Sequence, residues 1–361
     1  MTRAHNFNAG PAALPTEVLE KAQKELTNFN NTGMSVMELS HRSAEYEEVH
    51  NNAAALMKEL MNIPDDYEVL FLQGGASLQF SMLPMNFLPE KAPGNYVLTG
   101  SWSEKALKEA EAMGPTKVAG SAKETNYTYI PAFDSLDVDN DDAYVHITSN
   151  NTIFGTQWQD FDYDWKAPLF ADMSSDILSR PIPVERFSVI YAGAQKNLGP
   201  SGVTTVIIKK SLIEKEKSGV PTVLKYSTHS KANSLYHTPP TFAIYMLHNV
   251  LEWIKANGGA EGMEKRNKQK SDTIYAAIDE SGGFYTGHAE KDSRSRMNVT
   301  FTLPSEELTK AFLTEAKENG FIGLNGHRSV GGCRASIYNA VTQESCDALA
   351  SFMKKFHESS R

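Results

Sequence analysis

A lysine directly after an apolar segment is well suited to covalent chemistry. Lys196 follows the expected strand Val189–Ala192 and precedes a Gly-Pro-Ser-Gly turn at 199–202. Small neighbouring residues let a bulky ring approach the backbone, and a sheltered lysine loses its proton more readily than an exposed one. A neutral amine at the end of a strand could form a Schiff base with an aldehyde cofactor. Most lysines lie in surface loops, and this segment alone does not decide between the two interpretations.

A carboxylate stands at the end of the preceding expected strand. Asp172 follows Leu169–Ala171 directly. Burial of a carboxylate is costly unless the charge is paired, and a pyridinium nitrogen is one group that could pair with it. The simpler interpretation is an aspartate that caps the next helix. A strand-end aspartate followed one strand later by a strand-end lysine is the arrangement that pyridoxal phosphate enzymes use for the ring nitrogen and the aldehyde.

Two further segments would complete such a site. Gly74, Gly75, Ala76 and Ser77 form an expected strand-to-helix turn, where backbone N–H groups and the positive helix end suit a phosphate. The turn has neither the Walker lysine pattern nor GxGxxG, which disfavours a nucleotide site. Trp102, just after the expected strand Tyr96–Thr99, offers a flat face to a pyridine ring, although it could equally be a half-buried structural residue.

The elements that must position these residues alternate between strand and helix. The expected strands are Val69–Leu72, Tyr96–Thr99, Tyr144–Thr148, Leu169–Ala171, Val189–Ala192 and Val203–Lys209. Helical spacing in the intervening segments Leu78–Phe87 and Ser103–Met113 predicts an α/β fold with a mostly parallel sheet covered on both faces. The link after Ala192 is short, so the strand that follows it could be antiparallel.

A second, smaller domain is expected in the last hundred residues or so. Two long helices, Thr241–Lys255 and Ala260–Asp279, are expected on either side of Gly258-Gly259, a dipeptide that indicates a hinge or a domain boundary. The order then changes to strand, helix, strand and helix over 296–303, 305–319, 334–338 and 343–357, which predicts an α+β domain. We therefore expect an N-terminal segment at 1–15, a large domain at 16–258 and a small domain at 259–361.

Composition excludes several classes of protein. The 361 residues are 40% hydrophobic and 22% charged, with 35 Lys and Arg against 44 Asp and Glu, and a net charge of −9. No basic stripe suits a nucleic acid, and no apolar run of about 18 residues suits a membrane span. Cys333 and Cys346 form neither a CxxC pair nor a metal cluster, so we expect reduced packing residues and no metal site. The opening residues lack the apolar region of a secretory signal, which favours a cytoplasmic protein.

Taken in order, these segments resemble the phosphoserine aminotransferases, a family of class V, fold-type I pyridoxal phosphate enzymes. The similarity covers almost the whole chain. It is carried by Asn6–Pro15, Ser40–Ser43, Ala171–Asp176, Ile190–Gly202, Thr238–Thr241 and Gly326–Ser336. The resemblance implies a large domain with a mainly parallel seven-stranded sheet, a smaller C-terminal α+β domain, and pyridoxal 5'-phosphate as the cofactor.

The resemblance also implies the roles of the cofactor-site residues. Lys196 would hold the aldehyde and move the proton, Asp172 would pair with the ring nitrogen, and Trp102 would stack on the ring. Ala76, Ser77 and Gln195 would act at the phosphate, and Thr152 would bind the ring oxygen. His237 and Thr238 would reach the phosphate from the partner subunit of a homodimer. Some relatives carry arginine at the position of Ser77, and others carry asparagine at the position of His237.

The implied reaction is reversible transamination between L-glutamate and 3-phosphooxypyruvate, giving 2-oxoglutarate and O-phospho-L-serine in serine biosynthesis. The resemblance leaves open a second substrate, 4-phosphohydroxythreonine, in pyridoxine biosynthesis. Arg334 suits the α-carboxylate because a guanidinium can bind it with two parallel hydrogen bonds. His41, Arg42, His327 and Arg328 would surround the phosphate or the distal carboxylate of glutamate, the first two across the subunit interface.

Two other classes remain as alternatives. The chain could be another fold-type I enzyme, such as an alanine–glyoxylate aminotransferase or a cysteine desulfurase, and the latter would need a reactive cysteine such as Cys333. It could also be a catalytically silent protein that binds pyridoxal phosphate, although the lysine, the aspartate and the substrate arginines are all present.

Overall fold

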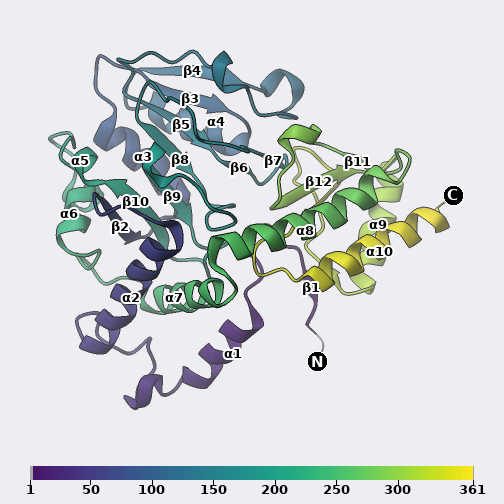
Figure 1. Cartoon of the computed structure of the whole chain (residues 1–361), viewed down its shortest axis with the longest axis horizontal. Helices are drawn as coiled ribbons and strands as arrows, with labels where there is room; N and C mark the ends of the chain where they lie inside the picture. Colours follow the sequence, from purple (N-terminus) through teal and green to yellow (C-terminus); the bar gives the residue numbers. More distant parts are fainter. Residues whose placement is uncertain (1–2, 361) are drawn as a thin grey trace.

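The computed structural model describes residues 3–360 of the chain. Figure 1 shows a larger body that contains the main sheet and a smaller body formed mostly by C-terminal residues. The long helix α8 (Gly259–Asp279) runs from the first body into the second. It follows α7 (Thr241–Ala256) after a break at Gly258, whose φ of 92° favours glycine. The limits 1–15, 16–258 and 259–361 remain a prediction.

Seven strands form the main sheet in the order β2-β10-β9-β8-β5-β3-β4, as expected for this fold class. They are β2 (Tyr67–Leu72), β3 (Gly94–Leu98), β4 (Thr116–Ser121), β5 (Tyr144–Thr148), β8 (Leu169–Asp172), β9 (Phe187–Gly193) and β10 (Thr204–Lys209). Only β10 is antiparallel to its neighbours, β2 and β9, and the other pairs are parallel. The antiparallel strand expected after Ala192 is thus confirmed.

Alternate residues of the strands enter two different cores. On β8, Leu169 and Ala171 belong to one hydrophobic cluster and Phe170 to the other, as the two-residue period of a strand requires. The first cluster includes residues of α1 (Thr16–Glu25), α2 (Ala44–Met61) and α7, and the second includes residues of α3 (Gly75–Phe87), α4 (Ser101–Glu111) and α6 (Tyr226–Lys231). Helices therefore cover both faces of the sheet. A single turn, α5 (Lys210–Ile213), follows β10.

The smaller body has its own core. Its antiparallel sheet has the order β11-β12-β14, formed by β11 (Thr286–Gly287), β12 (Asn298–Thr302) and β14 (Cys333–Ser336). Side chains of α8, α9 (Glu306–Glu318) and α10 (Gln343–Ser359) complete this cluster. Ser305 accepts a hydrogen bond from the Leu308 N–H and is the N-cap of α9.

The N-terminal segment crosses to this smaller core. β1 (His5–Asn6) pairs in parallel with β13 (Phe321–Ile322), and the fully buried Phe7 belongs to the C-terminal hydrophobic cluster. The chain then returns to the larger body, where the Ala12 N–H donates to the carbonyl oxygen of Gln195. Residues 5–12 therefore connect the two bodies.

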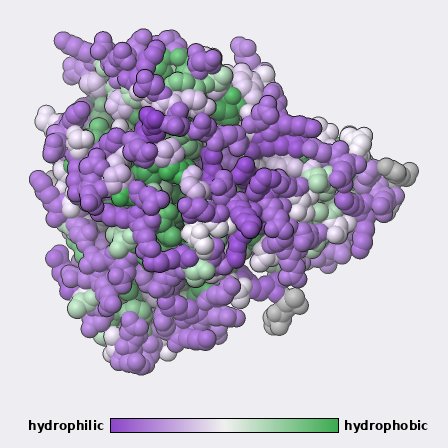
Figure 2. Space-filling model, viewed as in Figure 1, coloured by the Kyte–Doolittle hydropathy of each residue, from purple (hydrophilic) through white to green (hydrophobic). Residues whose placement is uncertain are grey.

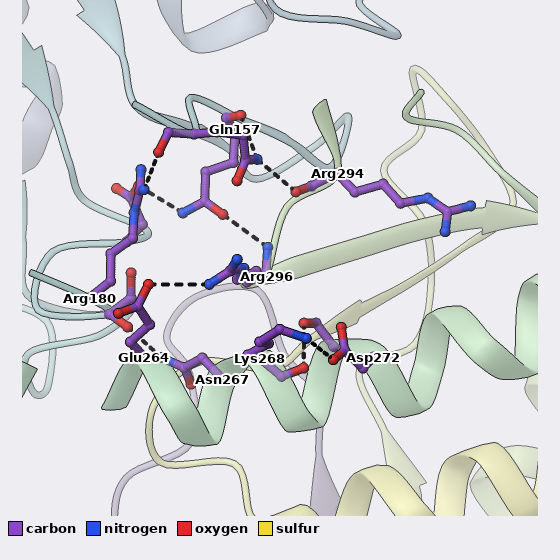
Figure 3. Close-up of polar contacts among 12 residues, drawn as sticks. Gln157, Arg180, Glu264, Asn267, Lys268, Asp272, Arg294 and Arg296 are labelled. Atoms are coloured by element: carbon purple, nitrogen blue, oxygen red, sulfur yellow. Dashed lines mark hydrogen bonds and ion pairs between the residues drawn. The ribbon is translucent and has the colours of Figure 1, made fainter. Parts of the chain in front are cut away.

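A polar seam joins the two bodies beside α8 (Figure 3). Strands β6 (Asn150–Asn151) and β7 (Thr156–Gln157) form a hairpin that ends with Gln157. The Oε1 atom of Gln157 accepts a hydrogen bond from the Arg296 backbone N–H at 3.0 Å, and its Nε2 atom donates one to Asp176 at 3.1 Å. Arg296 also contacts Glu264 of α8 at 3.4 Å. Because Gln157 is only 2% exposed, its hydrogen bonds are shielded from water and hold the seam together.

The surface seen in Figure 2 is mainly hydrophilic, with apolar side chains grouped over the larger body. Large apolar side chains that are exposed include Met34, Met37, Val223 and Tyr236. Within residues 3–360, no helix has both the length and the apolar character that crossing a membrane requires.

Candidate active site

A cavity of about 300 Å³ lies where the large-domain strands end and the smaller body begins. Its lining brings together nine of the residues expected from sequence: Ala76, Ser77, Trp102, Thr152, Asp172, Gln195, Lys196, His327 and Arg334. The carboxyl ends of parallel strands meet at one edge of a sheet, and this is where such folds bind ligands. The cavity is the candidate active site.

Lys196 reaches the cavity from the turn after β9. Its Nζ donates to Thr152 Oγ1 at 2.7 Å and lies 5.4 Å from the centre of the Trp102 ring. Burial lowers the pKa of Lys196 to about 8, although the nearby Asp172 carboxylate opposes this shift. An appreciable fraction of the amine is therefore neutral, and nucleophilic, near neutral pH.

Asp172 is the last residue of β8, and β8 pairs with β9. Its Oδ1 accepts two hydrogen bonds from Ser174, from the backbone N–H at 2.9 Å and from the hydroxyl at 2.6 Å. No residue within 3–360 donates a hydrogen bond to Oδ2. Burial raises the pKa of Asp172, while Lys196 and Ser174 act in the opposite direction. A cationic donor in the cavity would therefore find a carboxylate oxygen available and would favour its ionised form.

The turn into α3 exposes backbone donors to the same cavity. Gly74 and Gly75 have φ values of 86° and 65°, which glycine adopts without strain. No side chain caps the helix, so its first N–H groups are free to bind an anion. Ala76 and Ser77 in this first turn line the cavity, as expected of a phosphate site.

Trp102 and Gln195 complete the large-domain wall. Trp102 lies in the first turn of α4, and its indole Nε1 is buried without a hydrogen-bond partner. The ring can accept a planar group, while its N–H can still donate. Gln195 lies against Gly193, where a Cβ atom would stand 2.7 Å from Gln195 Oε1. Glycine at that position leaves room for the glutamine side chain beside the cavity.

Arg334 enters from β14 of the smaller body. Its Nη1 donates to the Thr152 carbonyl oxygen at 3.2 Å, and its Nε is buried without a partner. Burial lowers the pKa of Arg334, but a guanidinium remains charged at neutral pH. His327 stands nearby with its Nδ1 2.7 Å from Ser329 Oγ. Partial burial and the charges of Arg334, Arg328 and Lys105 lower the pKa of His327.

Five of the expected residues do not line the cavity of their own chain: His41, Arg42, His237, Thr238 and Arg328. His237 hydrogen-bonds Gln73 through Nε2, and its Nδ1 has no partner. His41 Nε2 is also buried without one, whereas the Arg42, Thr238 and Arg328 side chains are exposed. Their assigned roles remain predictions.

The cavity lining also contains residues that sequence reasoning missed: Ala9, Gly10, Ile153 and Ser174. Gly75, which belongs to the expected anion-binding turn, lines the cavity as well. A Cβ atom on Gly10 would stand 3.3 Å from Lys196 Cγ, so glycine permits the N-terminal segment to pass close to the lysine. The Asn-Ala-Gly-Pro sequence at 8–11 was the available signal. Ser174 lies two residues after Asp172, at the spacing of a side chain that hydrogen-bonds back to the aspartate.

The donors and acceptors fit pyridoxal phosphate. Asp172 Oδ2 is available for a protonated ring nitrogen, Lys196 for an aldehyde, the Trp102 face for a planar ring, and the α3 N-terminus for a phosphate. No group of three or more His, Cys, Asp or Glu residues in the described part of the chain is placed to hold a metal ion.

Comparisons with known proteins agree with this chemistry. The aminotransferase class-V family model matches residues 4–349. Phosphoserine aminotransferases from Halalkalibacterium halodurans and Bacillus subtilis are each 66% identical to this chain, over 100% and 99% of both sequences respectively. The structure of phosphoserine aminotransferase from Bacillus circulans subsp. alkalophilus is 55% identical, covers 99% of both chains and has a TM-score of 0.98. The structure of pyridoxal phosphate-bound phosphoserine aminotransferase from Trichomonas vaginalis is 39% identical to this chain and has a TM-score of 0.92. The match covers 98% of this chain and 100% of that one.

Proposed function

Because the chain belongs to the class-V aminotransferases, and within them to the phosphoserine aminotransferase family, we propose that it transfers the amino group of L-glutamate to 3-phosphooxypyruvate. The products are 2-oxoglutarate and O-phospho-L-serine, and the reaction is reversible. The observation that carries the proposal is the meeting of Lys196, Asp172 and Arg334 in one cavity. These residues provide an amine, an anion and a carboxylate-binding cation.

Pyridoxal phosphate, when bound, supplies an aldehyde that carries the amino group and a ring that delocalises negative charge. Lys196 would hold this cofactor and, once free, move a proton between two carbon positions as a general acid and base. Asp172 would keep the ring nitrogen protonated through Oδ2. Thr152, Gln195, Ala76 and Ser77 would orient the ring and the phosphate, and Trp102 would shield the ring from water.

Substrate recognition would rest on the cations of the smaller body. Arg334 Nη1 is held by a carbonyl oxygen and its Nε is unpaired, so the guanidinium has donors left for an α-carboxylate. Planar guanidinium groups bind carboxylates with two parallel hydrogen bonds. His327 and Arg328, which lie in the loop that precedes β14, would bind the phosphate or the distal carboxylate of glutamate.

A C2 homodimer would complete the site. His41, Arg42, His237 and Thr238 lie outside the cavity of their own chain. Exposed apolar residues flank them in sequence: Met34 and Met37 come before His41, and Tyr236 comes before His237. Exposed apolar side chains that gather in one patch mark surfaces that associate with another chain, and we propose that these residues contribute to such a patch. In the dimer, these four residues would reach the cavity of the partner subunit.

The state of the cysteines disfavours a desulfurase. Cys333 is fully buried, and burial raises the pKa of its thiol to about 12. A thiol of this kind is not a nucleophile at neutral pH. Cys333 and Cys346 are both free and buried, which is consistent with the reducing cytoplasm that we propose as the location.

The decisive experiment is an assay of the purified protein with glutamate and a series of oxo acids. We expect a much larger kcat/KM for 3-phosphooxypyruvate than for pyruvate or glyoxylate. Preferential amination of glyoxylate would instead support an alanine–glyoxylate type of activity. A protein that binds the cofactor and shows no spectral change with glutamate would be catalytically silent. The same assay with 4-phosphohydroxythreonine in the reverse direction tests the second substrate.

A further inference from the structure

Lys105 is a cation beside the active site to which the proposed reaction assigns no role. It lies on α4, one turn after Trp102, and its side chain is exposed. Its Nζ stands 4.3 Å from the centre of the Trp102 ring, and Lys196 Nζ approaches the same ring at 5.4 Å. The indole therefore lies within cation–π range of both ammonium groups. Lys105 thus belongs to the immediate surroundings of the cavity.

No residue in the described part of the chain neutralises Lys105. Its ammonium group takes part in no hydrogen bond or ion pair there. The acids close to it on α4 are engaged elsewhere, because Glu104 pairs with Lys123 at 2.7 Å and Glu109 accepts from Ser81 at 2.9 Å. An unpaired ammonium group in contact with a residue of the cavity lining is free to attract an anion.

The fixed positive charges of the cavity lining are fewer than the negative charges of the substrate. Its lining has two fixed cations, Lys196 and Arg334, and one carboxylate, Asp172. The pKa of His327 is lowered, so this residue is mainly neutral at neutral pH. A phosphate monoester carries about −1.5 to −2 at that pH, and the carboxylate of the substrate adds another charge. The positive charges of the cavity lining alone do not neutralise the negative charges of this substrate.

Lys105 and the His327 loop lie close enough for their charges to interact. The Lys105 charge contributes to the low pKa of His327, together with Arg334 and Arg328. Lys105 comes from the larger body and Arg328 from the smaller one, so a phosphate between them would be approached from two sides. The aromatic ring of Trp102 would restrict the movement of the Lys105 side chain.

We propose that Lys105 is a specificity-determining residue that attracts the phosphate of the phosphorylated substrate and so raises the preference for phosphorylated over unphosphorylated oxo acids. The proposal rests on the proposed function and assigns a further residue to its substrate site. Lys105 takes no part in proton transfer. Its effect is on binding, and it weakens as added salt screens exposed charges.

Three variants of the holoenzyme test the proposal. Lys105→Met keeps an unbranched side chain and removes the charge, and Lys105→Arg keeps the charge. Lys108→Met is the matched control, because Lys108 is another exposed lysine of α4 and its loss changes the net charge equally. For Lys105→Met we expect KM for 3-phosphooxypyruvate to rise about fivefold, with a change of less than twofold in KM for pyruvate. Lys105→Arg should restore the wild-type KM, and Lys108→Met should resemble the wild type.

Binding of inorganic phosphate to the holoenzyme, followed by calorimetry, is an independent measurement. Lys105→Met should weaken this binding, and 0.5 M KCl should reduce the difference between variant and wild type. Equal phosphate affinity in the two proteins would overturn the proposal, as would an equal effect of Lys108→Met. A loss that Lys105→Arg does not restore would show that positive charge at this position is not what binds the phosphate, and it too would overturn the proposal. If the wild type binds phosphate through Lys105 yet does not aminate 3-phosphooxypyruvate, the proposed function fails and the anion site remains.

Discussion

Arg334 Nη1 donates a hydrogen bond to the backbone carbonyl oxygen of Thr152 at 3.2 Å, although 182 positions separate the two residues. The hydroxyl of the same threonine accepts from Lys196 Nζ at 2.7 Å. One residue of the larger body therefore fixes the distance between the amine and the guanidinium of the smaller body. A substrate with a carboxylate at Arg334 would have its reacting carbon held on the side of Lys196.

The first prediction concerns Lys196. Lys196→Ala should fold normally and bind pyridoxal phosphate only non-covalently, with turnover reduced by several orders of magnitude, because nucleophile and general base are lost together. Borohydride reduction followed by mass spectrometry should detect a covalent adduct in the wild type and none in the variant. Lys108→Ala, on the surface of α4, is the control. Near-normal turnover in Lys196→Ala would contradict the assignment.

The second prediction concerns pH. Burial lowers the pKa of Lys196 to about 8, so the neutral amine increases as the pH rises through that value. Capture of added pyridoxal phosphate by the apoenzyme, followed by absorbance, should accelerate over pH 7–9 and level off above it. Below the midpoint the rate should fall about tenfold per pH unit, because only the neutral amine reacts. A midpoint near the ordinary lysine value of 10.5 would show that the amine is not shielded as the structure indicates.

The third prediction separates the charge of Asp172 from its shape. Asp172→Asn can retain hydrogen bonds from Ser174 to Oδ1 but removes the charge that favours a protonated ring nitrogen. The half-reaction with glutamate, measured by stopped-flow absorbance, should slow by about a hundredfold, at the upper end of the loss of a charge-assisted hydrogen bond. Cofactor affinity should change much less. If affinity falls and the rate does not, the aspartate is a structural anchor.

The convergence of Lys196 and Asp172 could be predicted because each follows an apolar run that can only be a buried strand. Adjacent parallel strands then bring their ends together. The edge strand β4 was missed because its sequence, Thr-Lys-Val-Ala-Gly-Ser, has no apolar run, and only one of its residues is buried. An edge strand exposed along most of its length does not need one.

Contacts between distant segments were harder to predict. The Asn-Ala-Gly-Pro sequence within Asn6–Pro15 signals a turn, but it does not say which residues the turn contacts. Neither the packing of Phe7 in the C-terminal core nor the contact of Gly10 with Lys196 can be read from it. Such contacts depend on how the two bodies meet. The positions of His41, Arg42, His237 and Thr238 relative to a complete site remain a prediction, because in a single chain none of them lines the cavity.

The fourth prediction concerns the seam between the two bodies. Gln157→Ala leaves the Arg296 N–H and one Asp176 oxygen without their buried partner, which should cost about 1–3 kcal/mol of the free energy of unfolding. Urea denaturation should show the loss as a lower midpoint with a similar slope. Gln269→Ala is the matched control, because Gln269 is exposed on α8. An equal stability of the two variants would mean that water replaces the lost bonds at the seam.

The last prediction tests whether two chains share each site. Arg42→Ala should weaken binding of the phosphorylated substrate about tenfold to a hundredfold, since a charge-assisted contact is worth about 1.5–3 kcal/mol. Subunits with Lys196→Ala are mixed with subunits with Arg42→Ala. If Arg42 contributes to the partner's cavity, each heterodimer has one intact site. That site combines the wild-type Lys196 of one chain with the wild-type Arg42 of the other. Random exchange makes about half of the dimers mixed, so activity at limiting substrate should recover to about a quarter of the wild type. Lys196→Ala mixed with Asp172→Asn is the control, because both residues line one chain's cavity and no intact site can form. Absence of recovery, with subunit exchange verified by mass spectrometry, would place Arg42 in the site of its own chain.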